Sequence, residues 1–223
     1  MGILSRAHAG FSRTGGGIIA VPIAIIAIMI DIYLLINGAT IFGSGFQTSD
    51  INTNVLELYL LMDGAVLFII PIQKTAFINI KAPDLIYWVP AFFLTGIIIG
   101  NTFHPLVPVH SAQYEIAALL FEIFVVTFSE TWIFLGVLQT YLMRRNVRFP
   151  YIWQAVIFGL FHYTAYGENI ISMAQAMAFG LIVGLIYYAA WTMKKPDIGL
   201  TLAWGIHAGW NVALITVIFI LFG

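Results

Sequence analysis

The sequence predicts an all-α protein, a polytopic membrane helix bundle of about seven transmembrane helices. Composition is the first reason: 61% of the 223 residues are hydrophobic and 9% are charged, whereas a soluble domain carries about 25% charged residues. A globular fold cannot bury that much apolar surface, so the lipid bilayer is the expected solvent. The spacing of the apolar segments and the placement of the positive charges between them are the second and third reasons.

Seven apolar segments are separated by short polar connections. Most of them approach the roughly 20 residues that cross the hydrocarbon core, and the fifth is shorter. They cover residues 18–42, 56–72, 86–103, 115–142, 151–166, 172–192 and 200–222. No linker or low-complexity tract divides them, so residues 1–223 are expected to form a single membrane domain. Within it, residues 1–110 contain three N-terminal helices to which the sequence assigns no role.

The positive charges alternate between connections. All nine Lys and Arg residues lie before segment one or between segments two and three, four and five, and six and seven; they are Arg6, Arg13, Lys74, Lys81, Arg144, Arg145, Arg148, Lys194 and Lys195. The other connections, about 43–55, 104–114 and 167–171, have none. Cytoplasmic loops carry the excess of Lys and Arg. This pattern predicts a multi-pass protein of the cell membrane with its N-terminus in the cytoplasm and its C-terminus outside.

Composition also argues against several classes of function. The net charge of −1 disfavours a nucleic-acid partner, because such partners are bound by strongly basic surfaces. The chain has no cysteine, which removes disulfides, thiolate metal ligands and a cysteine nucleophile. The chemistry available to the protein is therefore that of its five histidines, ten acids and hydroxyl groups.

Polar side chains inside the apolar segments are the candidate functional residues. Ionisable groups in hydrocarbon are costly and usually face the interior of a bundle. A rise of about 1.5 Å per residue from each cytoplasmic helix end places four of them roughly 15–21 Å deep; they are Glu130, His162, His207 and Asn211. Three other acids, Asp31, Asp63 and Glu122, belong to no motif and are expected to have structural or channel-lining roles.

Several kinds of chemistry fit this set. A carboxylate and a histidine can polarise water as a general base, and a histidine with an asparagine can donate to an oxyanion. Two histidines and one carboxylate are also a common metal-ligand set. The same groups can relay protons in a transporter.

Three motifs at these residues resemble the family of CAAX-type prenyl endopeptidases and bacteriocin-processing or immunity membrane proteins, the CPBP family. Its FxxxH motif is intact from Phe158 to His162, and its HxxxN motif is intact from His207 to Asn211. Its EExxxR motif, usually followed by a glycine, is only partly present. Glu130 matches the first glutamate and Gly136 matches the glycine after the motif, but Thr131 replaces the second glutamate and Leu135 replaces the arginine. The resemblance covers about residues 115–222, a protease-like four-helix core.

The resemblance implies an intramembrane endopeptidase that needs no metal and no cofactor. It implies that Glu130 and His162 activate a water for peptide hydrolysis, that His207 and Asn211 stabilise the oxyanion, and that Phe158 supports the site. The expected partners are membrane lipids and a hydrophobic or lipidated peptide substrate. Losing both members of the family's Glu–Arg pair leaves no orphan buried charge, so the change is compatible with an intact fold.

Two alternatives stay open from the sequence. A catalytically inactive relative on the same scaffold would serve as a subunit or assembly factor among other membrane-protein subunits, and the degraded first motif favours it. An ion or proton transporter would use the buried acids as its path. The absence of an obvious inverted repeat weakens the transporter hypothesis.

Overall fold

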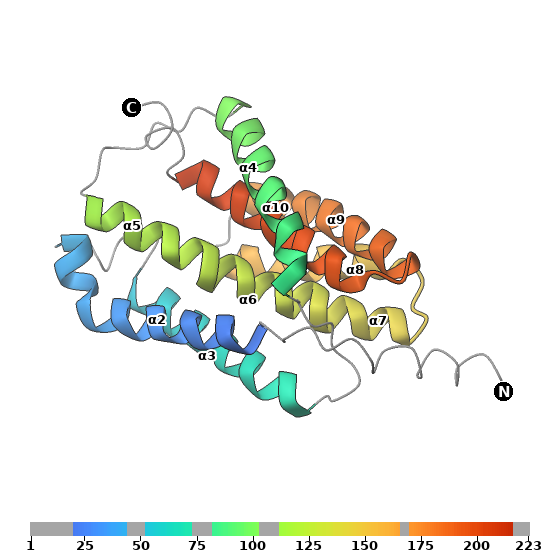
Figure 1. The fold of residues 1–223 in the computed structure, drawn as a ribbon, viewed down its shortest axis with the longest axis horizontal. Helices are drawn as coiled ribbons and strands as arrows, with labels where there is room; N and C mark the ends of the chain where they lie inside the picture. The colour runs from blue at the N-terminus through green and yellow to red at the C-terminus, as the bar shows by residue number, and fades with distance from the viewer. Residues whose placement is uncertain (1–19, 44–51, 73–81, 103–111, 166–169, 216–223) are drawn as a thin grey trace.

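The computed structural model describes residues 20–43, 52–72, 82–102, 112–165 and 170–215, and every regular element in these ranges is helical. In chain order the elements are α2 (Ala20–Phe42), α3 (Thr53–Ile72), η2 (Ala82–Asp84), α4 (Leu85–Thr102), α5 (Ala112–Leu120), η3 (Phe121–Val126), α6 (Thr127–Thr131), η4 (Trp132–Gln139), α7 (Thr140–Arg144), α8 (Pro150–Ala165), α9 (Ile170–Thr192) and α10 (Pro196–Ile215). Figure 1 shows their arrangement.

Within the described residues the helices coincide with the predicted apolar segments to within a few residues, and residues 216–222 of the seventh segment lie outside the described residues. Helices α5 to α7 follow one another without a break and together correspond to the fourth segment. Three helical stretches in the described residues are long and apolar enough to cross a membrane: Val21–Ile41, Ile116–Arg144 and Ile170–Thr192. In hydrocarbon every backbone N–H and C=O must be paired within the protein, which apolar segments achieve as helices. The all-helical prediction is confirmed for the described residues.

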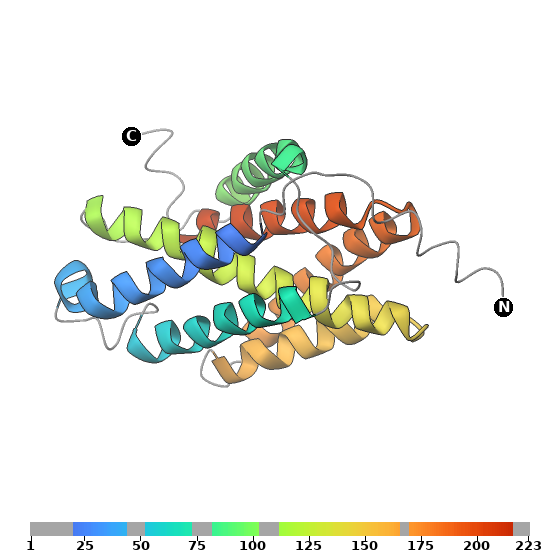
Figure 2. The ribbon, with the colours of Figure 1, turned by 60° about the horizontal axis from the view of Figure 1, so that its bottom comes forward.

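The continuous stretch 112–144, here called the central rod, forms the middle of the bundle. Its apolar window is 72% buried, against 33% for those of α2 and α9. Helices α2 and α3 contact it from one side, and α8, α9 and α10 contact it from the other. Figures 1 and 2 show α2 and α3 on one side of the rod, away from α10. The rod therefore links the N-terminal pair to the C-terminal helices.

Helix α4 packs against α10 at two glycines. A Cβ added at Gly209 would lie 2.3 Å from the carbonyl oxygen of Phe92, and one at Gly205 would lie 2.7 Å from that of Trp88. Small residues four apart let helix backbones approach this closely in membranes. Alongside them the rings of Trp88 and Trp204 lie 5.2 Å apart. A larger side chain at either glycine would push α4 away from α10.

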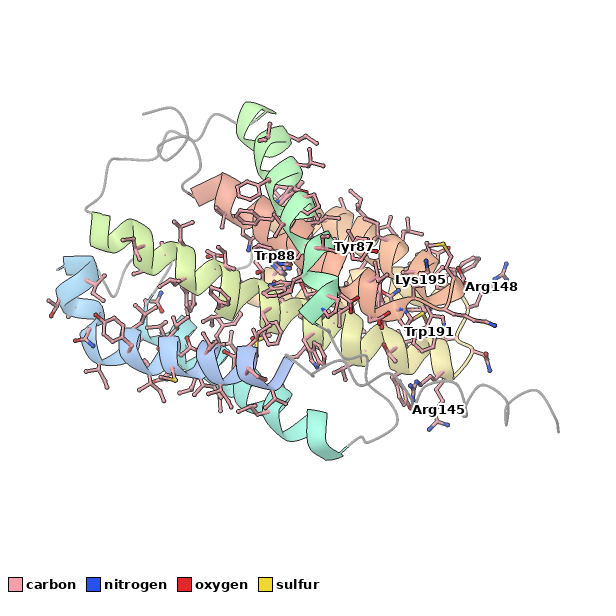
Figure 3. The ribbon with its side chains drawn as sticks, viewed as in Figure 1. Tyr87, Trp88, Arg145, Arg148, Trp191 and Lys195 are labelled. Carbon is pink, nitrogen blue, oxygen red and sulfur yellow. The ribbon has the colours of Figure 1, made fainter. Side chains whose placement is uncertain are left out.

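Two short turns at one end of the bundle carry the described cations. The turn before α8 contains Arg145 and Arg148, and the turn before α10 contains Lys195; Figure 3 places these residues and Trp191 at the same end. The Arg144 guanidinium, at the end of α7, lies 6.0 Å from the Trp191 ring near the end of α9, so the helices that lead into the two turns lie side by side. If each helix crosses the membrane in turn, the connections before α8 and before α10 must lie on the same side of it, and they lie at the same end of the bundle. The cations of the other two predicted cytoplasmic segments, Arg6, Arg13, Lys74 and Lys81, lie outside the described residues.

Candidate functional site

Glu130 lies in the middle of the central rod, on the short helix α6. Its side chain is fully buried. The rod is π-helical on both sides of it, in η3 and in η4. π-Helical turns put one extra residue into a turn and are frequent at functional sites. The wider turns change the direction in which successive side chains leave the rod. Glu130 contacts Tyr59 on α3 on one side and the histidines of α8 and α10 on the other.

Two histidines from separate helices face the same oxygen of Glu130. The Nε2 atom of His207, on α10, lies 3.5 Å from Glu130 Oε2, and the Nε2 atom of His162, on α8, lies 3.8 Å from it. Oε2 accepts no hydrogen bond from the described residues. The structure thus brings together three of the four predicted polar residues around a single carboxyl oxygen.

Phe158 separates and orients the two histidines. Its ring centroid lies 4.3 Å from that of His162 and 5.9 Å from that of His207. The Phe158 carbonyl oxygen lies 2.9 Å from His162 Nδ1. Because a carbonyl can only accept, this contact places a proton on Nδ1. The other nitrogen, Nε2, is then the one that can take up a proton on the side facing Glu130.

Thr131, which replaces the second glutamate of the motif, contacts the other histidine. Its Oγ1 lies 3.2 Å from His207 Nδ1. When the hydroxyl donates to Nδ1, the imidazole proton resides on Nε2, which faces the carboxyl oxygen. Leu135, which replaces the arginine, is buried in the apolar core of the rod. Both replacements are therefore accommodated without an unpaired charge.

Asn211 occupies a position that depth estimates from the sequence do not predict. Its Nδ2 donates a hydrogen bond of 3.0 Å to Glu122 Oε2, and Glu122 lies about two turns before Glu130 on the same rod. Counting the rise per residue places Asn211 in one layer with Glu130. The structure shows one group of contacts at Glu130 and another at Glu122, and among the described residues the hydrogen bond of Asn211 goes to Glu122.

Four residues in contact with the helix of Glu130 or with Asn211 are not assigned to the catalytic set by sequence reasoning. Tyr59, on α3, donates a hydrogen bond to Glu130 Oε1. Glu122 holds the amide of Asn211. Ser129 donates to Asp63, also on α3. Glu122 and Asp63 are visible as acids in apolar segments, whereas a tyrosine in such a segment carries no comparable signal.

Two histidines and a carboxylate are also a set of side chains that can bind a metal ion. Across the helices that the structure describes, no group of three or more His, Cys, Asp or Glu side chains is arranged to hold a metal ion. Glu130 and the two histidines place one acceptor oxygen beside two ring nitrogens, an arrangement through which a proton can pass.

Comparison with known proteins bears on the central rod and the helices that follow it. Residues 112–213 match the family described as type II CAAX prenyl endopeptidase Rce1-like. The match includes all three motif positions and confirms the resemblance that the motifs predict. No curated protein and no solved structure matches the chain.

Proposed function

Because residues 112–213 form an Rce1-like region, we propose that the protein is an intramembrane endopeptidase of the CAAX type. It hydrolyses a peptide bond in a membrane-associated substrate with a water activated by Glu130 and His162. The observation that carries the proposal is the arrangement at Glu130 Oε2, a buried carboxyl oxygen that accepts no hydrogen bond from the described residues and faces two histidine nitrogens. Other buried acid oxygens of the described residues also lack a hydrogen-bond partner, such as Asp63 Oδ2, so the two facing histidines distinguish Glu130.

The first step is deprotonation of water. The 3.8 Å separation of His162 Nε2 and Glu130 Oε2 exceeds a direct hydrogen bond, and a water lying beside both atoms can hydrogen-bond to each. The pair accepts one proton as the water oxygen bonds to the substrate carbonyl carbon. The fixed Nδ1 proton of His162 makes Nε2 the proton-accepting nitrogen.

The second step is stabilisation of the tetrahedral intermediate and loss of the amine. His207 Nε2–H, beside Glu130, donates to the developing oxyanion, and Asn211, one turn further along α10, is the second donor that the family resemblance implies. An asparagine amide has two N–H groups, and Glu122 occupies one of them, which leaves the other for the oxyanion. The C–N bond then breaks, the proton held by Glu130 and His162 passes to the leaving nitrogen, and the products are a carboxylate and an amine.

The substrate follows from the surroundings of the site. The catalytic carboxyl lies within a candidate membrane span, so the scissile bond must enter from the bilayer. This requirement favours a hydrophobic peptide or one carrying a lipid anchor. With the positively charged turns in the cytoplasm, the N-terminus lies on the cytoplasmic side of the cell membrane. The substrate then approaches from the cytoplasmic leaflet.

The test is cleavage of a panel of prenylated and hydrophobic peptides by the purified chain in lipid vesicles, followed by mass spectrometry. Wild type, Glu130→Gln and wild type with a chelator are compared, with thermal unfolding as the folding control. Cleavage lost only in the variant supports water activated by glutamate. Loss of cleavage with the chelator would assign the chemistry to a metal.

A second candidate is a catalytically inactive relative that acts as a membrane subunit. The replacement of the motif's Glu–Arg pair by Thr131 and Leu135 favours it. This hypothesis predicts that a folded wild type cleaves no peptide of a broad panel. It also predicts that partner membrane proteins co-purify equally with wild type and with Glu130→Gln.

A further inference from the structure

Helix α3 contacts the helix of Glu130 through two hydroxyl hydrogen bonds. Tyr59 and Asp63 are four residues apart and therefore share one face of α3, and both are buried. Tyr59 donates to Glu130 Oε1, while Ser129, the neighbour of Glu130, donates to Asp63 Oδ1. Helix α3 lies outside the Rce1-like region 112–213, so the match to the family gives no account of this face.

We propose that Tyr59 is a positioning residue for hydrolysis, which holds one oxygen of Glu130 so that the other faces the histidines. This inference rests on the proposed function, because it assigns a role within the same reaction. It also gives the N-terminal helices a part in the chemistry, since α3 supplies the donor.

A buried carboxyl needs such a donor to keep one orientation. The terminal torsion of glutamate is broad and roughly two-fold, so the side chain can exchange its two oxygens at small cost. Tyr59 fixes Oε1, and the unpaired Oε2 is then the oxygen that lies 3.5 and 3.8 Å from the histidine nitrogens. General-base catalysis requires the acceptor atom within hydrogen-bond reach of the water, which this division of the two oxygens provides.

Tyr59 is itself held in place by packing. Its ring is only 3% exposed and meets Phe121 edge to face, with centroids 5.7 Å apart. Phe121 belongs to η3 of the same central rod. The phenol therefore keeps a fixed position relative to Glu130, as a preorganised donor must.

The experiment compares Tyr59→Phe with Ser129→Ala in purified protein in lipid vesicles, using a peptide that wild type cleaves. Each variant removes one buried hydroxyl hydrogen bond between α3 and α6, and only Tyr59→Phe removes a bond to Glu130. We expect kcat to fall roughly 10- to 100-fold in Tyr59→Phe, the range for a hydrogen bond to a charged group, with KM within about threefold of wild type. Ser129→Ala should keep kcat within about threefold while losing thermal stability to a similar extent.

A second readout needs no catalysis. The infrared band of the Glu130 carboxyl group, identified by its disappearance in Glu130→Gln, should shift in Tyr59→Phe and remain in place in Ser129→Ala. Equal kcat in Tyr59→Phe and wild type, or equal loss in both variants, would overturn the positioning role while leaving the protease proposal standing. A wild type that cleaves nothing would overturn the protease proposal and the positioning role with it.

Discussion

Two buried carboxyl groups on neighbouring helices show how partners decide what an acid does inside a membrane. Glu130 and Asp63 are both removed from solvent, and each accepts a hydrogen bond from a hydroxyl group. Beyond that bond their surroundings differ. The second oxygen of Glu130 faces two histidines, whereas the carboxyl of Asp63 interacts with that of Asp31 on α2.

The difference separates a reactive group from a structural one. Two carboxyl groups side by side in a buried site repel each other when both are ionised, which suits such a pair to a structural role rather than to accepting a proton from substrate water. Glu130 instead has imidazole neighbours that can exchange a proton with it. Burial of an acid in an apolar helix therefore does not by itself identify catalysis; the neighbouring titratable groups do.

Removing the histidine that shares the water should have the largest effect among variants around Glu130. We expect His162→Ala to lower kcat by about 10²- to 10⁴-fold, the usual contribution of a positioned acid–base group. Cleavage kinetics measure the loss, and added imidazole should restore part of it by entering the space left behind. Full activity in His162→Ala would contradict the assignment of His162 to water activation.

A smaller effect is expected where a residue acts through another. Glu122 accepts a hydrogen bond from Asn211, so Glu122→Gln should weaken the orientation of the amide and lower kcat roughly tenfold, equivalent to about 1.4 kcal/mol. The measurement is a double-mutant cycle with Asn211→Ala. Once Asn211 is absent, Glu122→Gln should have no further effect on kcat. Additive losses would show that Glu122 acts independently of Asn211.

The smallest effect is expected at the acid pair. Asn has nearly the shape of Asp and can donate to Asp63, so Asp31→Asn should preserve the contact between α2 and α3. We expect its melting temperature to stay within about 3 °C of wild type, which corresponds to about 1 kcal/mol for a chain of this size. Thermal unfolding in detergent measures it. A fall of more than about 10 °C would show that the pair depends on an ionised Asp31.

Much of the site follows from the sequence because its signals are local. Glu130, His162 and His207 are ionisable residues in apolar segments, and the spacing of four between Phe158 and His162 puts both on one helix face. The apolar segments also predict the helices closely. These features depend on hydrophobic length and helical period, which a single sequence displays directly.

The remaining contacts depend on packing between distant segments. Tyr59 is 71 positions from Glu130 in the chain, and nothing around it distinguishes it from a tyrosine at the membrane interface. The π-helical stretches around Glu130 have no local sequence signal that we recognise, yet they help determine which helix each side chain meets. The predicted cytoplasmic N-terminus stays a prediction, because no membrane defines the two faces.

The most direct test of the account compares Glu130→Gln with Asp63→Asn in one cleavage assay. Both changes replace a buried carboxyl by an amide of nearly the same shape. We predict that Glu130→Gln lowers kcat by at least about 10²-fold with little change in melting temperature, while Asp63→Asn keeps kcat within about threefold of wild type. Equal loss of activity in both folded variants, or full activity in Glu130→Gln, would contradict the assignment of Glu130 as the base.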